Sequence, residues 1–164
     1  MMFKKVIISI LTILSIVSVT LFINYYYHNN FIKSNLLIIC DQPLASSINP
    51  IINIAYVANF EGNTISVIDG KTNSVVNTIK VGTHPDAVSV NPRANIAYVA
   101  NSNDNTISVI DGKTNSVVNT IKVGTHPDAV SVDPQTTMVY VANFGDNTIS
   151  VIDGKTTKAL SESH

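Results

Sequence analysis

Short apolar runs alternate with clusters of turn residues through the last three quarters of the chain. In the middle of that region the runs cover residues 87–90, 96–100, 106–110 and 117–123, and all are rich in Val, Ile, Tyr, Thr or Ala. Runs of this length and composition predict β-strands rather than helices. The breaks between them contain Asn-Pro and Asp-Gly pairs, which supply the fixed or positive φ of a chain reversal. The pattern therefore predicts four antiparallel strands joined by short turns.

The same group of four strands recurs with a period of 42 residues. Residues 63–90 return without a change as residues 105–132, and a third copy starts at Asn147. A fixed period of this size indicates one supersecondary unit stacked on copies of itself. A four-stranded unit of this length has the size of a propeller blade.

Both faces of the predicted strands carry apolar or small side chains. In the run 106–110, Ile107 and Val109 point to one face, whereas Ser108 and Ile110 point to the other. A strand without a polar face needs cover on both sides. Stacked blades provide that cover, so the alternation favours an all-β propeller.

The motifs of the repeat resemble those of a known family. Tyr56-Val-Ala-Asn59, Tyr98-Val-Ala-Asn101 and Tyr140-Val-Ala-Asn143 are similar to the signature of YVTN-type β-propeller repeats. The resemblance covers roughly residues 43–155. It implies a β-propeller, usually seven-bladed, of archaeal and bacterial surface proteins that often take part in cell-surface interaction. Related propellers include lactonases and the haem-d1 or copper domains of denitrification enzymes, but none of their haem or copper ligand sets is recognisable here.

Three repeats fall short of a closed ring, because propellers typically have four to eight blades. The expected blades cover residues 43–84, 85–126 and 127–154. A candidate extra strand precedes them at 35–39, and residues 155–164 form a tail. In this arrangement the third blade lacks its last strand.

Two interpretations of that strand order stay open. In the first, a homodimer closes a six-bladed ring, and the strand at 35–39 of each copy completes the third blade of the other. In the second, the chain is a truncated propeller fragment without independent function, whose open edges favour aggregation.

An apolar segment precedes the repeats. Lys4 and Lys5 are followed by residues 6–23, which carry no charge, and by three tyrosines. The length fits a transmembrane helix better than a signal-peptide core, and tyrosines suit the membrane interface. The sequence predicts a signal anchor within residues 1–30 and an extracytoplasmic repeat domain, or a secreted domain if the segment is cleaved.

Composition narrows the classes of partner. Charged residues make up 13% of the chain and the formal net charge is −1, so no basic surface for nucleic acid is expected. A single cysteine, Cys40, excludes an intrachain disulfide.

The strongest candidates for a binding site lie in the segments that connect successive blades. His84, Asp86, His126 and Asp128 occur there in the repeated Thr-His-Pro-Asp sequence. In a propeller these connections lie near the channel mouth, where the side chains are candidates for channel-face loop contacts with a polar ligand or a metal. Pro and Asp are also common turn residues, so a structural role is the alternative.

The sequence therefore predicts a non-enzymatic cell-surface module that mediates protein or surface interaction, with no catalytic residue, no cofactor and no metal. The near-identity of the copies is the reason, since a catalytic site requires different residues from different places. A lactonase-like or redox propeller enzyme is the alternative.

Overall fold

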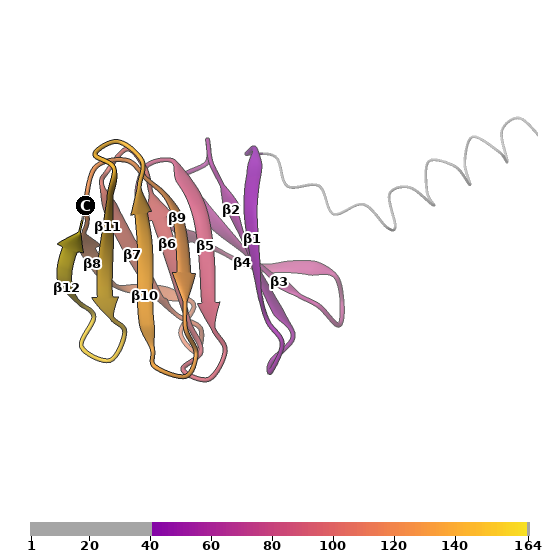
Figure 1. The fold of residues 1–164 in the computed structure, drawn as a ribbon. Coiled ribbons are helices and arrows are strands. Elements are labelled where there is room, and N and C mark those ends of the chain that lie inside the picture. The colour runs from indigo at the N-terminus through magenta and orange to yellow at the C-terminus, as the bar shows by residue number, and fades with distance from the viewer. Residues whose placement is uncertain (1–40, 164) are drawn as a thin grey trace, which may run out of the picture. The chain divides into compact units, whose positions relative to one another are not determined.

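The computed structural model of the protein describes residues 41–163, which form twelve strands in three four-stranded antiparallel sheets (Figure 1). Blade one contains β1 (Pro43–Asn49), β2 (Ile54–Asn59), β3 (Thr64–Asp69) and β4 (Ser74–Lys80). Blade two contains β5 (Pro85–Asn91), β6 (Ile96–Asn101), β7 (Thr106–Asp111) and β8 (Ser116–Lys122). Blade three contains β9 (Pro127–Val132), β10 (Met138–Asn143), β11 (Thr148–Asp153) and β12 (Lys158–Ser163).

Each strand pairs with its neighbours in the sequence, so every blade is a simple meander. In blade two, Tyr98 of β6 lies opposite Ser89 of β5 and Val109 of β7. This register places the tyrosine and Val109 on the same face of the sheet. The predicted strands and their antiparallel order are confirmed.

The three blades meet through their first strands. Contacts between neighbouring sheets concentrate in β1, β5 and β9, which run side by side, whereas the fourth strands hardly touch one another (Figure 1). The sheets therefore fan outward from the first strands, as blades do from a propeller axis.

Two hydrophobic cores fill the spaces between the blades. The first contains residues of blades one and two, and the second contains the equivalent residues of blades two and three. Ile107 and Val109 belong to the second core, while Ile110 on the other face of β7 belongs to the first. Blade two is thus covered on both sides, which confirms the interpretation of its two apolar faces.

The end of the chain corrects one prediction. The third blade was expected to lack its last strand, with residues 155–164 as a tail. Instead, β12 pairs with β11 in antiparallel register, with Lys158 opposite Asp153 and Ala159 opposite Ile152. A strand on an open sheet edge is held by backbone hydrogen bonds, which do not require the repeat's side chains. The expected donation of a strand from a second copy is therefore unnecessary, because this edge is already filled.

The turns correct a second prediction. Positive φ was expected at the glycines of the Asp-Gly pairs, but no glycine among residues 41–163 has positive φ. The left-handed residue is instead the last of each turn, such as Asn115 with a φ of 50°. Its partner at the start of the turn is Asp111, whose Oδ1 accepts the backbone N–H of Lys113 at 2.8 Å. Asparagine tolerates the left-handed region better than most residues, so it closes the turn.

The predicted signal anchor at 6–23 and the candidate strand at 35–39 lie outside the described residues. Within residues 41–163, the chain contains no helix with the length and apolar character needed to cross a membrane.

Candidate functional site: the loop face and an inter-blade cleft

The connections between blades and the loops between second and third strands lie at the same edge of the molecule. In blade three, β9 runs away from this edge, β10 returns to it and β11 leaves it again (Figure 1). We call this edge the loop face; it contains residues 41–42, 60–63, 81–84, 102–105, 123–126 and 144–147. The four residues predicted as loop contacts lie in it or at the adjoining strand starts.

Backbone hydrogen bonds fix the two histidines of this face. The N–H of His84 donates to Oδ1 of Asn63 in the preceding blade at 2.8 Å, and the N–H of His126 donates to Asn105 in the same way. Both histidines have a left-handed backbone, with φ of 53° and 52°. The same left-handed conformation ends the other turns of the three blades, so it is a feature of the repeat. The loop backbone between blades is therefore held in one conformation.

Two aspartates that were not among the predicted site residues also accept hydrogen bonds from the connections between blades. Oδ2 of Asp104 accepts the N–H of Thr83 at 2.6 Å, and Oδ2 of Asp146 accepts the N–H of Thr125 at 2.7 Å. The Thr148 hydroxyl also donates to Asp146 at 2.6 Å. The hydrogen bond from Thr148, followed by the bond from Thr125, lowers the pKa of Asp146, because both stabilise the ionised carboxylate.

Two aromatic rings lie beside the histidines. The Phe60 ring stacks on His84 with 4.2 Å between centroids, and Phe144 lies 6.2 Å from His126 at a tilt of 60°. Phe144 is 70% exposed, the largest exposed fraction among the large apolar side chains of the described residues. In the middle copy Ser102 occupies the equivalent position. The rings thus give the loop face two aromatic–histidine pairs.

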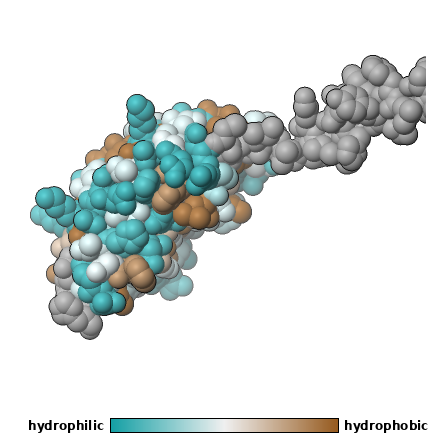
Figure 2. All heavy atoms as spheres, turned by 90° about the horizontal axis from the view of Figure 1, so that it is seen from above, coloured by the Kyte–Doolittle hydropathy of each residue, from teal (hydrophilic) through white to brown (hydrophobic). Residues whose placement is uncertain are grey.

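The loop face is predominantly acidic. Among its described residues and the adjoining strand ends it carries six carboxylates and two lysines: Asp41, Glu61, Asp86, Asp104, Asp128, Asp146, Lys80 and Lys122. Figure 2 views the molecule from this side and shows a largely hydrophilic surface interrupted by hydrophobic patches.

The predicted site residues are only partly brought together. His84 and His126 lie in equivalent connections of two blades, and Asp86 and Asp128 are the second residues of β5 and β9. Among residues 41–163, no group of three or more His, Cys, Asp or Glu side chains is placed to hold a metal ion.

Sequence reasoning missed Phe60 and Phe144, although a signal was present. They occupy a position at which the otherwise repeated sequence changes, since Ser102 stands between them in the middle copy.

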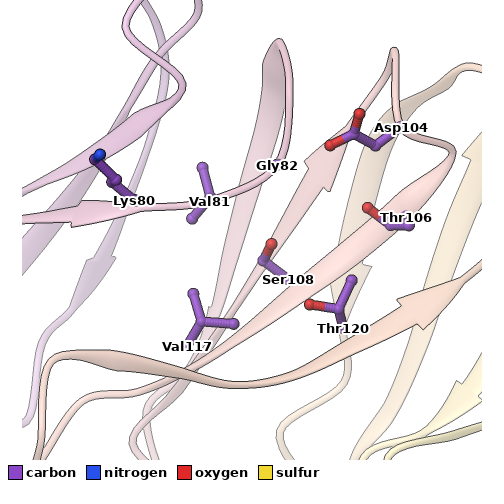
Figure 3. Close-up of a pocket in the computed structure, with 8 residues that line it drawn as sticks. All are labelled: Lys80, Val81, Gly82, Asp104, Thr106, Ser108, Val117 and Thr120. Atoms are coloured by element: carbon purple, nitrogen blue, oxygen red, sulfur yellow. The ribbon is translucent and has the colours of Figure 1, made fainter.

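A cleft of about 500 Å³ opens between blades one and two (Figure 3). Lys80 lies on one side of it and Asp104 on the other, with the hydroxyl groups of Thr106, Ser108 and Thr120 between them. This lining is suited to a small polar ligand with hydrogen-bonding groups.

The asparagine that ends each Tyr-Val-Ala-Asn motif has a structural role below the loop face. The Nδ2 group of Asn101 donates to Thr106 at 3.1 Å and to Ser108 at 2.9 Å, and Asn59 and Asn143 make the equivalent bonds. Each side chain therefore ties the end of a second strand to the third strand of the same blade. The Oδ1 atoms of all three are buried without a hydrogen-bond partner.

Comparisons with known proteins agree with this architecture. The sequence profile of the family described as "Lactonase, 7-bladed beta-propeller" matches residues 53–164. Among solved structures, Kuenenia stuttgartiensis hydrazine synthase superposes with a TM-score of 0.72 at 25% identity, over 78% of this chain and 37% of that chain. This chain therefore spans little more than a third of that protein's length. No curated protein matches the sequence.

These matches correct the prediction that the chain is not an enzyme. Both the family and the structural neighbour are named for enzymes, so they point to an enzyme-type propeller. The prediction rested on the near-identity of the repeats. That argument fails because Phe60, Ser102 and Phe144 show that equivalent positions do differ between blades, and because a site can also form in a cleft between blades.

Proposed function

This chain belongs to the lactonase family of seven-bladed β-propellers, and we propose that its loop face binds a protein partner through a segment rich in lysine or arginine. The observation that carries the proposal is the combination of two aromatic–histidine pairs, one of them with the exposed Phe144, with six carboxylates on one edge.

The chemistry of the face favours cationic side chains. Clustered carboxylates attract a basic segment at long range, and an ammonium or guanidinium group over a phenylalanine ring gains a further cation–π attraction. Phe144 is exposed enough to receive such a group. The pinned backbone at His84 and His126 means that little conformational entropy is lost on binding.

The context proposed for this binding is the cell surface. A signal anchor at residues 6–23 would place the repeats outside the cytoplasm. The three Tyr-Val-Ala-Asn segments favour the YVTN type of repeat, whose resemblance implies cell-surface interaction.

Fluorescence anisotropy of the full chain in nanodiscs, with labelled oligolysine as the probe and oligoglutamate for comparison, tests this proposal. We expect oligolysine alone to bind, and its affinity to fall as salt rises. Asp86→Asn with Asp128→Asn should weaken binding. Asp69→Asn with Asp111→Asn, at the opposite edge, is the matched control and should leave affinity unchanged. Equal loss in both pairs would mean non-specific charge attraction and would refute a site on the loop face.

A second candidate function is hydrolysis of a lactone, which the family match favours. The cleft beside Lys80 and Asp104 has the size and polarity for a small hydroxylated ring. Proton release from γ- and δ-lactones by the full chain measures this activity. We expect Lys80→Ala to reduce turnover and Lys71→Ala, on an exposed turn, to leave it unchanged. Absence of lactone turnover in the unaltered chain would remove this candidate without affecting the first.

A further inference from the structure

The contact between neighbouring blades occurs twice with equivalent residues. We call the face that a blade turns to the following blade its forward face, and the opposite face its backward face. The forward faces of blades one and two pack on the backward faces of blades two and three. The two cores therefore show what a forward face requires from its partner.

Blade three carries the same forward face without a partner among the described residues. Its residues Ala129, Ser131, Tyr140, Ala142, Ile149 and Val151 are identical to their equivalents in blades one and two. Tyr140 and Ile149 are each 47% exposed, whereas the equivalent Tyr98 and Ile107 are 1% and 0% exposed. We call this surface the open forward face; it has the side chains that pack between the other blades, but here they are exposed.

Blade one offers the matching backward face. Ala55, Val57 and Ile68 are equivalent to Ala97, Val99 and Ile110, which are buried in the first core. Ile48 is 62% exposed, whereas its equivalent Val90 is 7% exposed. The larger Ile48 replaces the valine at position 90, whereas the polar Ser46 replaces the valine at position 88, so the face of blade one is less apolar at that one position.

Polar groups on the two open faces are complementary as well. The Ser47 and Ser89 hydroxyls accept the N–H of Val90 and Val132 at 3.2 Å in the two internal contacts. The next pair in this series is Ser131, which is exposed, and the N–H of Ile48.

Asparagine side chains make a second repeated hydrogen bond between neighbouring blades. Asn63 and Asn105 accept the N–H of His84 and His126. The next pair is Asn147, which is exposed, and the N–H of Gln42. Gln42 has a φ of 51°, within a few degrees of both histidines, so its N–H is already oriented as theirs are.

The hydroxyl of each buried repeat tyrosine packs against a glycine of the following blade. A methyl group at Gly112 or Gly154 would lie 2.7 Å from the hydroxyl oxygen of Tyr56 or Tyr98 of the preceding blade. At the equivalent Gly70, the three nearest atoms all belong to Asn53 of its own blade, so no tyrosine lies there. Gly70 thus leaves room for the hydroxyl of Tyr140.

We propose that a second copy of this chain occupies these faces, with the open forward face of each copy on the open backward face of the other. A two-fold axis along the propeller axis makes the two contacts identical and gives a closed ring of six blades. The family is described as seven-bladed, so this ring would have one blade fewer, and six blades lie within the range of known propellers. The contact uses sheet faces and exchanges no strand, because β12 already fills the edge beside β11.

Cross-linking between two tagged versions of the full chain in nanodiscs tests the contact. One version carries Ser131→Cys and the other Ile48→Cys, both with Cys40→Ser, and a short bis-maleimide joins cysteines that lie close together. We expect a product that carries both tags. Ser89→Cys with Val132→Cys in a single chain is the matched control, because that pair makes the same hydrogen bond inside the chain. Lys71→Cys and Lys113→Cys on separate chains should give no product.

Two results would overturn the proposal. The first is an intrachain link in the control without any link between the tagged copies. The second is a ladder beyond two copies when one chain carries both Ser131→Cys and Ile48→Cys, which would show an open chain of blades instead of a closed ring.

A charge on the open forward face adds an independent measurement. With Ile149→Asp in both versions, we expect the yield of the two-tag product to fall about tenfold or more, because a carboxylate without a partner is costly to bury. The intrachain control link should form as before. A two-tag yield unaffected by Ile149→Asp would also refute the proposal, since the contact would then lie elsewhere.

Discussion

The burial of a side chain decides how much it contributes to stability. Ile107 is fully buried in the second core, whereas Val118 on the outer strand β8 is 56% exposed. We expect Ile107→Ala to lower the free energy of unfolding by about 2–5 kcal/mol, because it removes buried apolar volume and leaves a cavity. Val118→Ala should change it by less than about 0.5 kcal/mol. Urea denaturation of both variants measures the difference; similar losses would show that the blades are not packed face to face.

Tyr56 and Tyr98 make stability sensitive to alkaline pH. Burial, and then the negative charge of Asp111 or Asp153, raises the pKa of each above its usual value of 10.0. The unfolded chain therefore loses these phenolic protons at a lower pH than the folded chain. Their contribution is complete below pH 10 and is lost as the pH rises from there through the folded pKa.

Thermal melts between pH 8 and pH 11.5 test this effect. We expect the melting temperature of the unaltered chain to fall above pH 10 more steeply than that of Tyr56→Phe with Tyr98→Phe, because phenylalanine cannot ionise. Parallel curves would show that these two tyrosines do not control the alkaline loss.

At the scale of elements, the turns depend on asparagines with positive φ. Asn115 closes the turn between β7 and β8 with a φ of 50°. We expect Asn115→Gly to preserve stability, since glycine adopts this conformation at no steric cost. Asn115→Val should lower the free energy of unfolding by about 1–2 kcal/mol, because a β-branched side chain clashes with a left-handed backbone. Equal stability of the two variants, measured in urea, would contradict the turn geometry.

Much of the element order was predictable, because the period of 42 residues and the two-faced strands describe a stack of like units. The final strand was not, since β12 departs from the repeat and is held by backbone pairing. The site was predictable only in part. His84 and His126 follow from the repeated connection, but their pairing with Phe60 and Phe144 depends on how loops from different parts of the sequence meet.

At the scale of the whole molecule, three blades leave two matching sheet faces without cover among residues 41–163. Tyr140 and Ile149 on one, and Ile48 on the other, are exposed where their equivalents are buried. A sheet with such faces is prone to association, and the internal contacts between blades specify the partner that fits.

The most direct test of this account is native mass spectrometry of the full chain released from nanodiscs at micromolar concentration, with Ile149→Asp measured beside it. The account predicts a complex of two chains of 17.7 kDa each, and single chains for the variant. Single chains of the unaltered protein, or two-chain complexes that persist in Ile149→Asp, would contradict closure of the ring through these faces.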